Sequence, residues 1–211
     1  LNNFDEWKTG DIFIQKDLAE TLKRISIEGN KGFYSGQTAR LIVEEMKKNN
    51  GFISFEDLES YESIYRNPVV GTYRGYTIVS MGPPSSGGVL LIQMLNMLEN
   101  YDLENMQRNS TEFVHLLTEV QRLAYADRAV HLGDPDFWQN PIQMLTSKQY
   151  AKERLKLISS STATASTEIA AGNQLNESME TTHYSVMDKE GNTAGITTTI
   201  NFSYGNKKIV D

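Results

Sequence analysis

Hydrophobic residues recur at steps of three and four along much of the chain, which is the spacing of one buried helix face. Leu18, Leu22 and Ile25 predict an amphipathic helix over residues 15–29, and Gly29 is expected to end it. Further helices are predicted over residues 37–49, 55–61, 89–98, 110–130 and 147–158.

Small and polar residues mark where these elements begin and end. Ser54 is followed three residues later by Asp57, so we expect Ser54 to cap a short helix that starts at residue 55. Clusters of Gly, Pro, Ser and Asp predict turns at residues 32–36, 83–88 and 133–136.

Two pairs of segments have the composition of β-strands. Residues 69–73 and 76–79 are rich in β-branched and aromatic residues and are separated by an Arg-Gly pair, which predicts a hairpin. Residues 181–187 and 193–201 alternate in polarity on either side of the polar loop 188–192, which predicts a second hairpin. Helices and strands together predict an α/β fold.

The chain is expected to have three regions. Residues 1–158 hold all the predicted helices and form a helix-rich region. Residues 159–180 begin with a run built almost wholly of Ser, Thr and Ala, so this segment is expected to be flexible. Residues 181–211 contain the second hairpin.

The composition excludes several classes of function. The chain has 211 residues, a formal net charge of -7 and no cysteine. Its Lys and Arg residues are scattered, so no nucleic-acid partner is expected. Without cysteine there is no disulfide and no thiolate chemistry. His115 and His131 lack the spacing of metal ligands, so no metal site is expected.

Membrane and targeting signals are also missing from the sequence. No apolar run reaches the roughly 18 residues of a membrane-spanning helix, so no span is expected in this chain. No signal peptide opens the sequence, and residue 1 is Leu, so we expect the sequence to begin inside a longer polypeptide.

The candidate chemistry lies where the Ser- and Thr-rich segment reaches Thr181. A flexible segment that delivers a Thr to the start of a strand suits a chain that cleaves itself. The Thr181 hydroxyl would attack the carbonyl of Glu180, and water would open the resulting ester to leave an N-terminal Thr181. Its α-amine, with an ordinary pKa of about 7.7–8.0, could then serve as the base that the weakly nucleophilic hydroxyl needs.

The second hairpin adds a geometric prediction. If residues 188–192 form the loop, Met187 pairs with Thr193 and Thr181 pairs with Thr199. Directly opposed Cβ atoms lie roughly 4.5–5.5 Å apart, and Asn201 would be within diagonal reach on the same face. A slip of one residue would remove this arrangement.

These residues resemble a known family. Residues 181–186, 188–192 and 199–201 are similar to the start of the small subunit of γ-glutamyltransferases (γ-glutamyltranspeptidases), which are N-terminal nucleophile hydrolases. Large-subunit landmarks occur in family order at Gly10-Asp11, Gly32-Phe33-Tyr34, Tyr73-Arg74-Gly75-Tyr76, Pro83-Pro84-Ser85-Ser86-Gly87-Gly88, Ala124-Tyr125-Ala126-Asp127-Arg128 and Gly133-Asp134-Pro135-Asp136-Phe137. The chain thus resembles the later large subunit followed by the first hairpin of the small subunit.

The resemblance implies a fold and a set of roles. The fold would be a four-layer αββα sandwich, incomplete in this chain. Thr181 would be both the self-processing and the catalytic nucleophile, with cleavage between Glu180 and Thr181. Thr199 matches the position whose hydroxyl supports the nucleophile. Asn201 matches a position that hydrogen-bonds the bound glutamyl group.

The resemblance also implies a reaction and partners. An acyl-enzyme on the threonine would pass the γ-glutamyl group of a glutathione-like donor to water, an amino acid or a peptide, without a cofactor. The cleaved protein would be a heterodimer of large and small subunits, exported to the periplasm or the exterior. The family's substrate-carboxylate Arg, its acidic pair, its Ser pair and its oxyanion glycines match no position in this chain.

Simpler interpretations compete for several residues. His183 is expected to have a structural packing role, since an N-terminal Thr brings its own base. Ser85 and Ser86 lack the Gly-x-Ser-x-Gly pattern of a nucleophilic serine, so a helix N-cap is expected there. Asp134 and Asp136 flank a Pro and are expected to form a turn.

Two other functions remain open from the sequence. A related amidohydrolase of the same fold, such as a poly-γ-glutamate depolymerase or a β-lactam acylase, would use the same nucleophile on another substrate. A non-catalytic truncated fragment would carry the nucleophile without the rest of the site.

Overall fold

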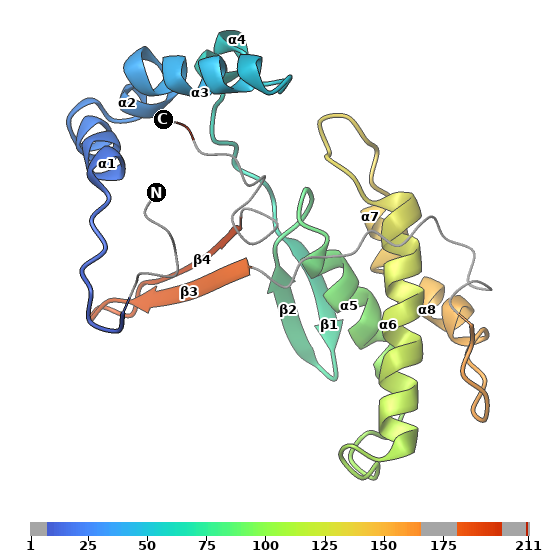
Figure 1. Cartoon of the computed structure of the whole chain (residues 1–211). Coiled ribbons are helices and arrows are strands. Elements are labelled where there is room, and N and C mark those ends of the chain that lie inside the picture. The colour runs from blue at the N-terminus through green and yellow to red at the C-terminus, as the bar shows by residue number, and fades with distance from the viewer. Residues whose placement is uncertain (1–7, 166–180, 200–209, 211) are drawn as a thin grey trace. The chain divides into compact units, whose positions relative to one another are not determined.

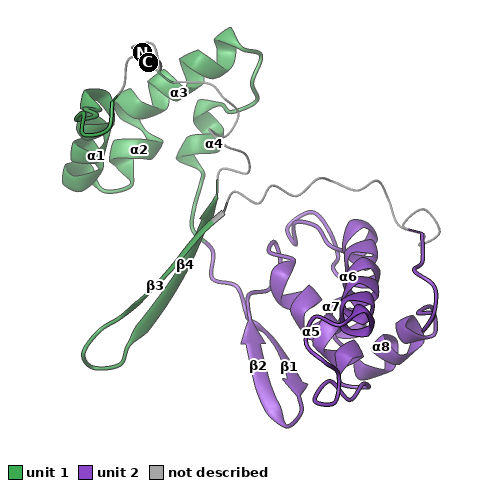
Figure 2. Cartoon of the chain, turned by 60° about the horizontal axis from the view of Figure 1, so that its bottom comes forward, with its two compact units in different colours: residues 1–63, 177–211 green, residues 64–176 purple. Residues whose placement is uncertain are grey.

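The computed structural model describes residues 8–165, 181–199 and 210. Figure 1 shows the chain, and Figure 2 shows its division into two compact units. One unit comprises residues 1–63 and 177–211, and the other comprises residues 64–176.

The first unit begins with helices, with bounds α1 Lys16–Glu28, α2 Lys31–Tyr34, α3 Gly36–Lys48 and α4 Phe55–Glu59. The predicted cap of α4 is confirmed, because Ser54 Oγ accepts the Asp57 N–H at 3.2 Å and the Ser54 N–H donates to Asp57 Oδ2 at 2.8 Å. The predicted turn at 32–36 is instead partly helical: α2 is a single helical turn, in which the Tyr34 N–H donates to the carbonyl of Asn30.

The buried core of these helices is small. It consists of Ala39, Val43 and Leu58, with Tyr34 and Ile42 packed against it. None of its buried residues comes from α1. On the face of α1 that the sequence predicted to be buried, Leu18 and Leu22 are exposed and Ile25 is half-buried.

The second unit combines a hairpin with helices. Strands β1 Val69–Tyr73 and β2 Tyr76–Ser80 pair antiparallel as predicted. The helices are α5 Gly87–Leu98, α6 Thr111–His131, α7 Ile142–Leu145 and α8 Lys148–Leu155. Helix α5 contacts the hairpin as well as α6, α7 and α8. It is therefore the central element of this unit.

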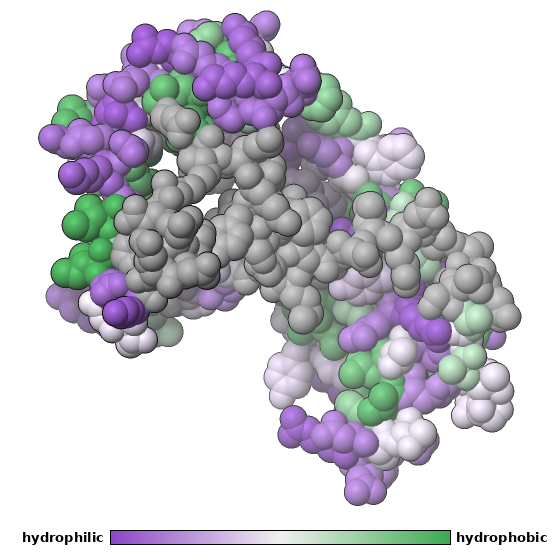
Figure 3. Space-filling model, in the orientation of Figure 1, coloured by the Kyte–Doolittle hydropathy of each residue, from purple (hydrophilic) through white to green (hydrophobic). Residues whose placement is uncertain are grey.

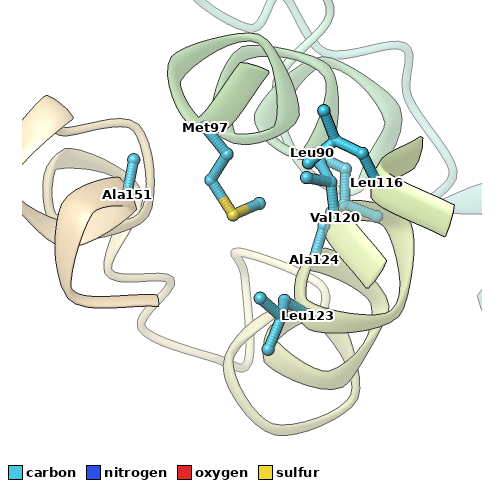
Figure 4. Close-up of a cluster of buried hydrophobic side chains, with 7 residues drawn as sticks. All are labelled: Leu90, Met97, Leu116, Val120, Leu123, Ala124 and Ala151. Carbon is cyan, nitrogen blue, oxygen red and sulfur yellow. The ribbon is translucent and has the colours of Figure 1, made fainter. Parts of the chain in front are cut away.

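Two buried clusters surround α5. The larger one, shown in Figure 4, joins α5, α6 and α8 through Leu90, Met97, Leu116, Val120, Leu123, Ala124 and Ala151. In Figure 4 the Met97 side chain extends from α5 into the space between α6 and α8. The smaller cluster joins the hairpin, α5 and α7 through Val69, Val89, Ile92 and Leu145.

The helix prediction differs from the structure near the end of this unit. The short helix α7 was not predicted, and α8 ends at Leu155 rather than at residue 158. Beyond α8, Lys156, Leu157 and Ile158 each donate to the carbonyl three residues earlier. These bonds continue the chain as tight turns instead of an α-helix.

A polar cluster is buried among α5, α6 and α8. The Asp127 carboxylate accepts from Gln93 Nε2 at 2.5 Å and from the Tyr150 hydroxyl at 3.0 Å, and it pairs with Arg154 Nη2 at 3.1 Å. Burial, together with the charge of Asp127, raises the pKa of Tyr150 to about 12. The cluster therefore links three helices through one carboxylate.

Large hydrophobic side chains also reach the surface. Figure 3 shows green hydrophobic residues among the purple hydrophilic ones. On the second unit, Val70 and Val79 oppose each other across the β1–β2 hairpin, and both are exposed. The face of the hairpin away from α5 thus carries these two valines beside Thr72 and Thr77, and all four are exposed.

Candidate active site

The second predicted hairpin is present with the predicted register. Strands β3 Thr181–Met187 and β4 Thr193–Thr199 pair antiparallel, with Met187 opposite Thr193 and Thr181 opposite Thr199. The backbone therefore brings the two threonines to directly facing positions at one end of the hairpin. This confirms the predicted register and the pairing of Thr181 with Thr199. The predicted place of Asn201 and the chemical roles of these residues stay predictions.

Asp188 closes the loop that sets this register. Its Oδ1 accepts the N–H groups of Glu190 at 3.0 Å and Asn192 at 2.8 Å, and its Oδ2 accepts from Asn192 Nδ2 at 2.8 Å. The hydrogen bond from the Asn192 side chain is the main cause that lowers the pKa of Asp188. Gly191 has φ 86, a conformation that favours Gly. The sequence pattern did not reveal this role of Asp188, although an Asp that begins a turn is a usual signal for it.

His183 lies next to the facing threonines on the same hairpin. Successive positions of a strand alternate between its two faces, so positions 181, 183 and 185 share one face of the hairpin. The His183 Nδ1 atom lies 2.8 Å from Thr197 Oγ1, and its Nε2 atom lies 3.2 Å from Ser185 Oγ. The imidazole thus connects the two strands and two hydroxyl groups, which the sequence did not predict.

Some predicted site residues fall outside the described part of the chain. Glu180 and Asn201 are not described, nor are residues 166–180 of the segment expected to be flexible. For Thr181 the structure describes the backbone pairing but not the side chain.

The start of the Ser- and Thr-rich segment, in contrast, is described and bonded to α6. His115 Nε2 lies 2.7 Å from the carbonyl of Ser159, and the Thr164 N–H donates to Glu119 Oε1 at 3.1 Å. Glu119 is 1% exposed and pairs with Arg122 at 2.6 Å. Residues 159–164 are therefore held against this helix.

The serine candidates have a different role from the predicted cap. Ser86 occupies the N-cap position of α5, but no side-chain cap hydrogen bond forms there. Its hydroxyl instead accepts from Arg128 Nε on α6 at 2.9 Å. Ser85 forms the hydrogen bond to the helix start instead, because its Oγ accepts the N–H of Gly87, the first residue of α5, at 3.4 Å. The cap prediction is therefore correct in position for Ser86, whose hydroxyl bonds to Arg128, whereas the bond to the helix backbone comes from Ser85.

The aspartate pair forms the predicted turn. The Asp136 N–H donates to Asp134 Oδ1 at 3.0 Å, and the Asp136 carboxylate pairs with Arg66 at 2.7 Å. That ion pair lowers the pKa of Asp136. Within the described residues no group of three acidic or histidine side chains could hold a metal ion. No helix in the described ranges is long and apolar enough to cross a membrane.

The chain is similar to known proteins along its whole length. The "Gamma-glutamyltranspeptidase" family model matches residues 1–211. The glutathione hydrolase proenzyme of Escherichia coli (strain K12) is 45% identical over 199 residues, covering 94% of this chain and 34% of that protein. The acylase ACY 1 proenzyme of Pseudomonas sp. (strain V22) is 44% identical over 196 residues, covering 93% of this chain and 35% of that protein.

A solved structure supports the same relationship. The Helicobacter pylori gamma-glutamyltranspeptidase has a TM-score of 0.71 and 48% sequence identity, over 82% of this chain and 52% of that chain. This likeness confirms the expected α/β fold of the N-terminal nucleophile hydrolase type. The chain spans about a third of the length of the curated relatives named above. Since the family model matches from the first residue to the last, the chain belongs to the gamma-glutamyltranspeptidase family.

Proposed function

We propose that the polypeptide containing this chain hydrolyses or transfers the γ-glutamyl group of γ-glutamyl amides such as glutathione, using Thr181 as the nucleophile. The observation that carries the proposal is the pairing of Thr181 with Thr199 at the start of β3, in a chain of this family. A relative that is 45% identical is named a glutathione hydrolase proenzyme, which fits an enzyme made from a precursor.

The proposal begins with self-cleavage. The Thr181 hydroxyl attacks the carbonyl carbon of Glu180, the C–N bond breaks, and the acyl group moves from nitrogen to oxygen. Water then hydrolyses the ester, which leaves an α-carboxylate at the new C-terminus on Glu180 and a free α-amine on Thr181. That amine supplies the base that a threonine hydroxyl needs, because the hydroxyl is a weak nucleophile at its ordinary pKa.

Turnover uses the same two groups. The α-amine takes the proton as the Thr181 oxygen attacks the γ-carbonyl of the donor, and it returns the proton to the leaving amine. The acyl-enzyme is then opened by water, an amino acid or a peptide. Thr199 supports the nucleophile from the facing strand. Asn201 binds the glutamyl group. No cofactor takes part.

Other parts of the polypeptide complete the site. A glutamyl donor carries an α-carboxylate and an α-ammonium group, and both need partners when they leave water. The chain spans about a third of its curated relatives, and we place these partners and the oxyanion donors in the remainder. Cleavage then yields a heterodimer of large and small subunits, which we propose is exported.

A second candidate function is an acylase activity. The ACY 1 proenzyme, at 44% identity, is nearly as similar as the glutathione hydrolase at 45%. An acylase would use the same threonine on an amide with another acyl group. Comparing the turnover of a γ-glutamyl anilide, poly-γ-glutamate and a glutaryl amide distinguishes the candidate functions, because each substrate presents a different acyl group.

Self-cleavage of the complete polypeptide tests the proposal. The wild-type precursor should yield two bands and a new N-terminus that begins Thr-Thr-His. Thr181→Ala should stay uncleaved and inactive. Thr198→Val is the matched control, because Thr198 neighbours Thr199 but pairs with Thr182 on the other face. Cleavage of Thr181→Ala at the same bond and rate would show that another residue is the nucleophile.

A further inference from the structure

One side-chain contact on the β3–β4 hairpin is not used by the proposed chemistry. His183 and Thr197 are directly opposed in the ladder, and His183 Nδ1 lies 2.8 Å from Thr197 Oγ1. The other ring nitrogen, Nε2, lies 3.2 Å from Ser185 Oγ on the same strand. Both nitrogens of the ring therefore contact a hydroxyl group.

This arrangement is unsuited to a base for Thr181. A neutral imidazole has one donor and one acceptor nitrogen, and a hydroxyl can satisfy either of them. With Nδ1 at Thr197 and Nε2 at Ser185, no ring nitrogen is left for a proton from the nucleophile. The ring is better suited to holding the two strands at a fixed offset.

The contact lies beside the reactive pair. His183 follows Thr181 by two residues on β3, and Thr197 precedes Thr199 by two residues on β4. The facing pairs 181–199 and 183–197 are therefore neighbours on one face. A slip of one residue would separate both pairs together, so a side-chain bond that fixes one pair also fixes the other.

The opposite strand leaves room for the ring. A Cβ built on Gly195 would lie 3.6 Å from the Cε1 atom of His183, which is ordinary van der Waals contact. Replacing Gly195 with Ala should therefore leave the ring in place. This gives a control that changes the same face of the hairpin without breaking a hydrogen bond.

We propose that His183 is a positioning residue for self-cleavage and for turnover. Its bond to Thr197 holds Thr199 opposite Thr181, and its bond to Ser185 sets the orientation of the ring. The inference rests on the proposed function, because it assumes that Thr181 is the nucleophile.

Two amide substitutions of His183 separate its two contacts. An Asn amide nitrogen occupies about the position of Nδ1, whereas a Gln amide nitrogen occupies about that of Nε2. In the complete polypeptide, His183→Asn should keep the contact to Thr197 and cleave within about twofold of the wild-type rate. His183→Gln should lose that contact and cleave roughly 3- to 10-fold more slowly, as expected for one net hydrogen bond. Gly195→Ala should behave like the wild type.

Thr197→Val provides the reciprocal test. It keeps the β-branched shape without the hydroxyl, and it should slow cleavage as much as His183→Gln. The double variant that combines His183→Gln with Thr197→Val should cleave no more slowly than either single variant, because all three lack the bond between His183 and Thr197. In the cleaved enzyme, the loss should appear in kcat with KM unchanged, since the nucleophile and not the substrate pocket is disturbed.

The outcomes distinguish the inference from the proposed function. Equal rates for His183→Asn and His183→Gln, or additive losses in the double variant, would overturn the positioning role. The positioning role would also be overturned if the cleavage rates of the variants fell in proportion to their melting temperatures, because that result indicates a general structural role. If Thr181→Ala is still cleaved, the proposed function fails. If Thr181→Ala is uncleaved while His183→Gln is as fast as the wild type, only this inference fails.

Discussion

Replacing Asp127 with Asn should destabilise the protein strongly, although Asp127 lies outside the proposed site. The Asp127 side chain is 7% exposed, and its carboxylate accepts from Gln93 and Tyr150 while it pairs with Arg154. An Asn of the same shape can still accept from two neighbours. It cannot neutralise the Arg154 guanidinium, whose side chain is only 16% exposed.

The structure sets the size of this effect. Removing one partner of a buried ion pair costs about 3–5 kcal/mol, because the other charge stays buried without compensation. We expect about 3 kcal/mol, since Arg154 keeps some contact with water and a bond from Nη2 to the Leu123 carbonyl at 3.3 Å. For a chain of this length, 1 kcal/mol shifts the melting temperature by roughly 2–4 °C, so the shift should be about 6–12 °C.

Thermal and urea unfolding of Asp127→Asn, Arg154→Met and the double variant measure the interaction free energy between Asp127 and Arg154. Asp127→Asn combined with Arg154→Met removes both charges and should recover much of the loss, because apolar replacement of a buried pair is often neutral. The coupling between the two sites should then exceed about 1 kcal/mol. A loss below about 1 kcal/mol in Asp127→Asn, or strictly additive effects, would refute the view that the pair is buried and tightly coupled.

Four further outcomes are expected. The pKa of Tyr150, raised by burial to about 12, lies above its ordinary value of 10.0. The fold therefore loses stability as the pH rises from 10.0 to about 12, and Tyr150→Phe should flatten this decline in urea unfolding. Thr199→Ala should slow self-cleavage and turnover by roughly 5- to 150-fold, as followed on gels and with a γ-glutamyl anilide. In Gly88→Ala the new Cβ would lie 2.2 Å from a backbone carbonyl oxygen, so its melting temperature should fall well below that of Gly87→Ala, where the nearest atom is 3.6 Å away. Residues 1–211 expressed alone should not turn over γ-glutamyl substrates, and Thr181-dependent turnover by this chain would place a complete site within it.

The features that the sequence predicted well are set by residues near one another in the chain. The capping box of α4 needs only Ser54 and Asp57, three residues apart. The β3–β4 register follows from a five-residue loop, because its length fixes which residues face each other. The pairing of Thr181 with Thr199 could thus be predicted from the sequence alone, although it depends on a single loop assignment.

Other features could not be predicted because their partners are distant in sequence. Gln93 is 34 residues from Asp127, and Tyr150 is 23 residues from it. A helical pattern marks Asp127 as polar, but only the packing of three helices shows that it is buried. The hydrogen bond to the Ser86 hydroxyl could not be predicted for the same reason, because its donor Arg128 lies 42 residues away.

The hydrophobic pattern also predicted the burial of α1 incorrectly. Leu18 and Leu22 have the spacing of a buried face, yet both are exposed on α1. Periodicity predicts that a face is apolar, and it does not identify what covers that face. The helix itself was therefore predicted correctly, whereas its burial was not.

Stability and the proposed chemistry are carried by different parts of the chain. The larger buried clusters lie among β1, β2, α5, α6, α7 and α8, whereas all residues from 182 to 199 are exposed. A two-stranded hairpin is marginally stable in water, so the register of β3 and β4 depends strongly on local contacts such as those of Asp188 and His183. Self-cleavage requires Thr181 to be in place before the bond to Glu180 breaks. A change that loosens the hairpin should therefore slow the cleavage of the precursor more than it slows turnover by molecules that have already been cleaved.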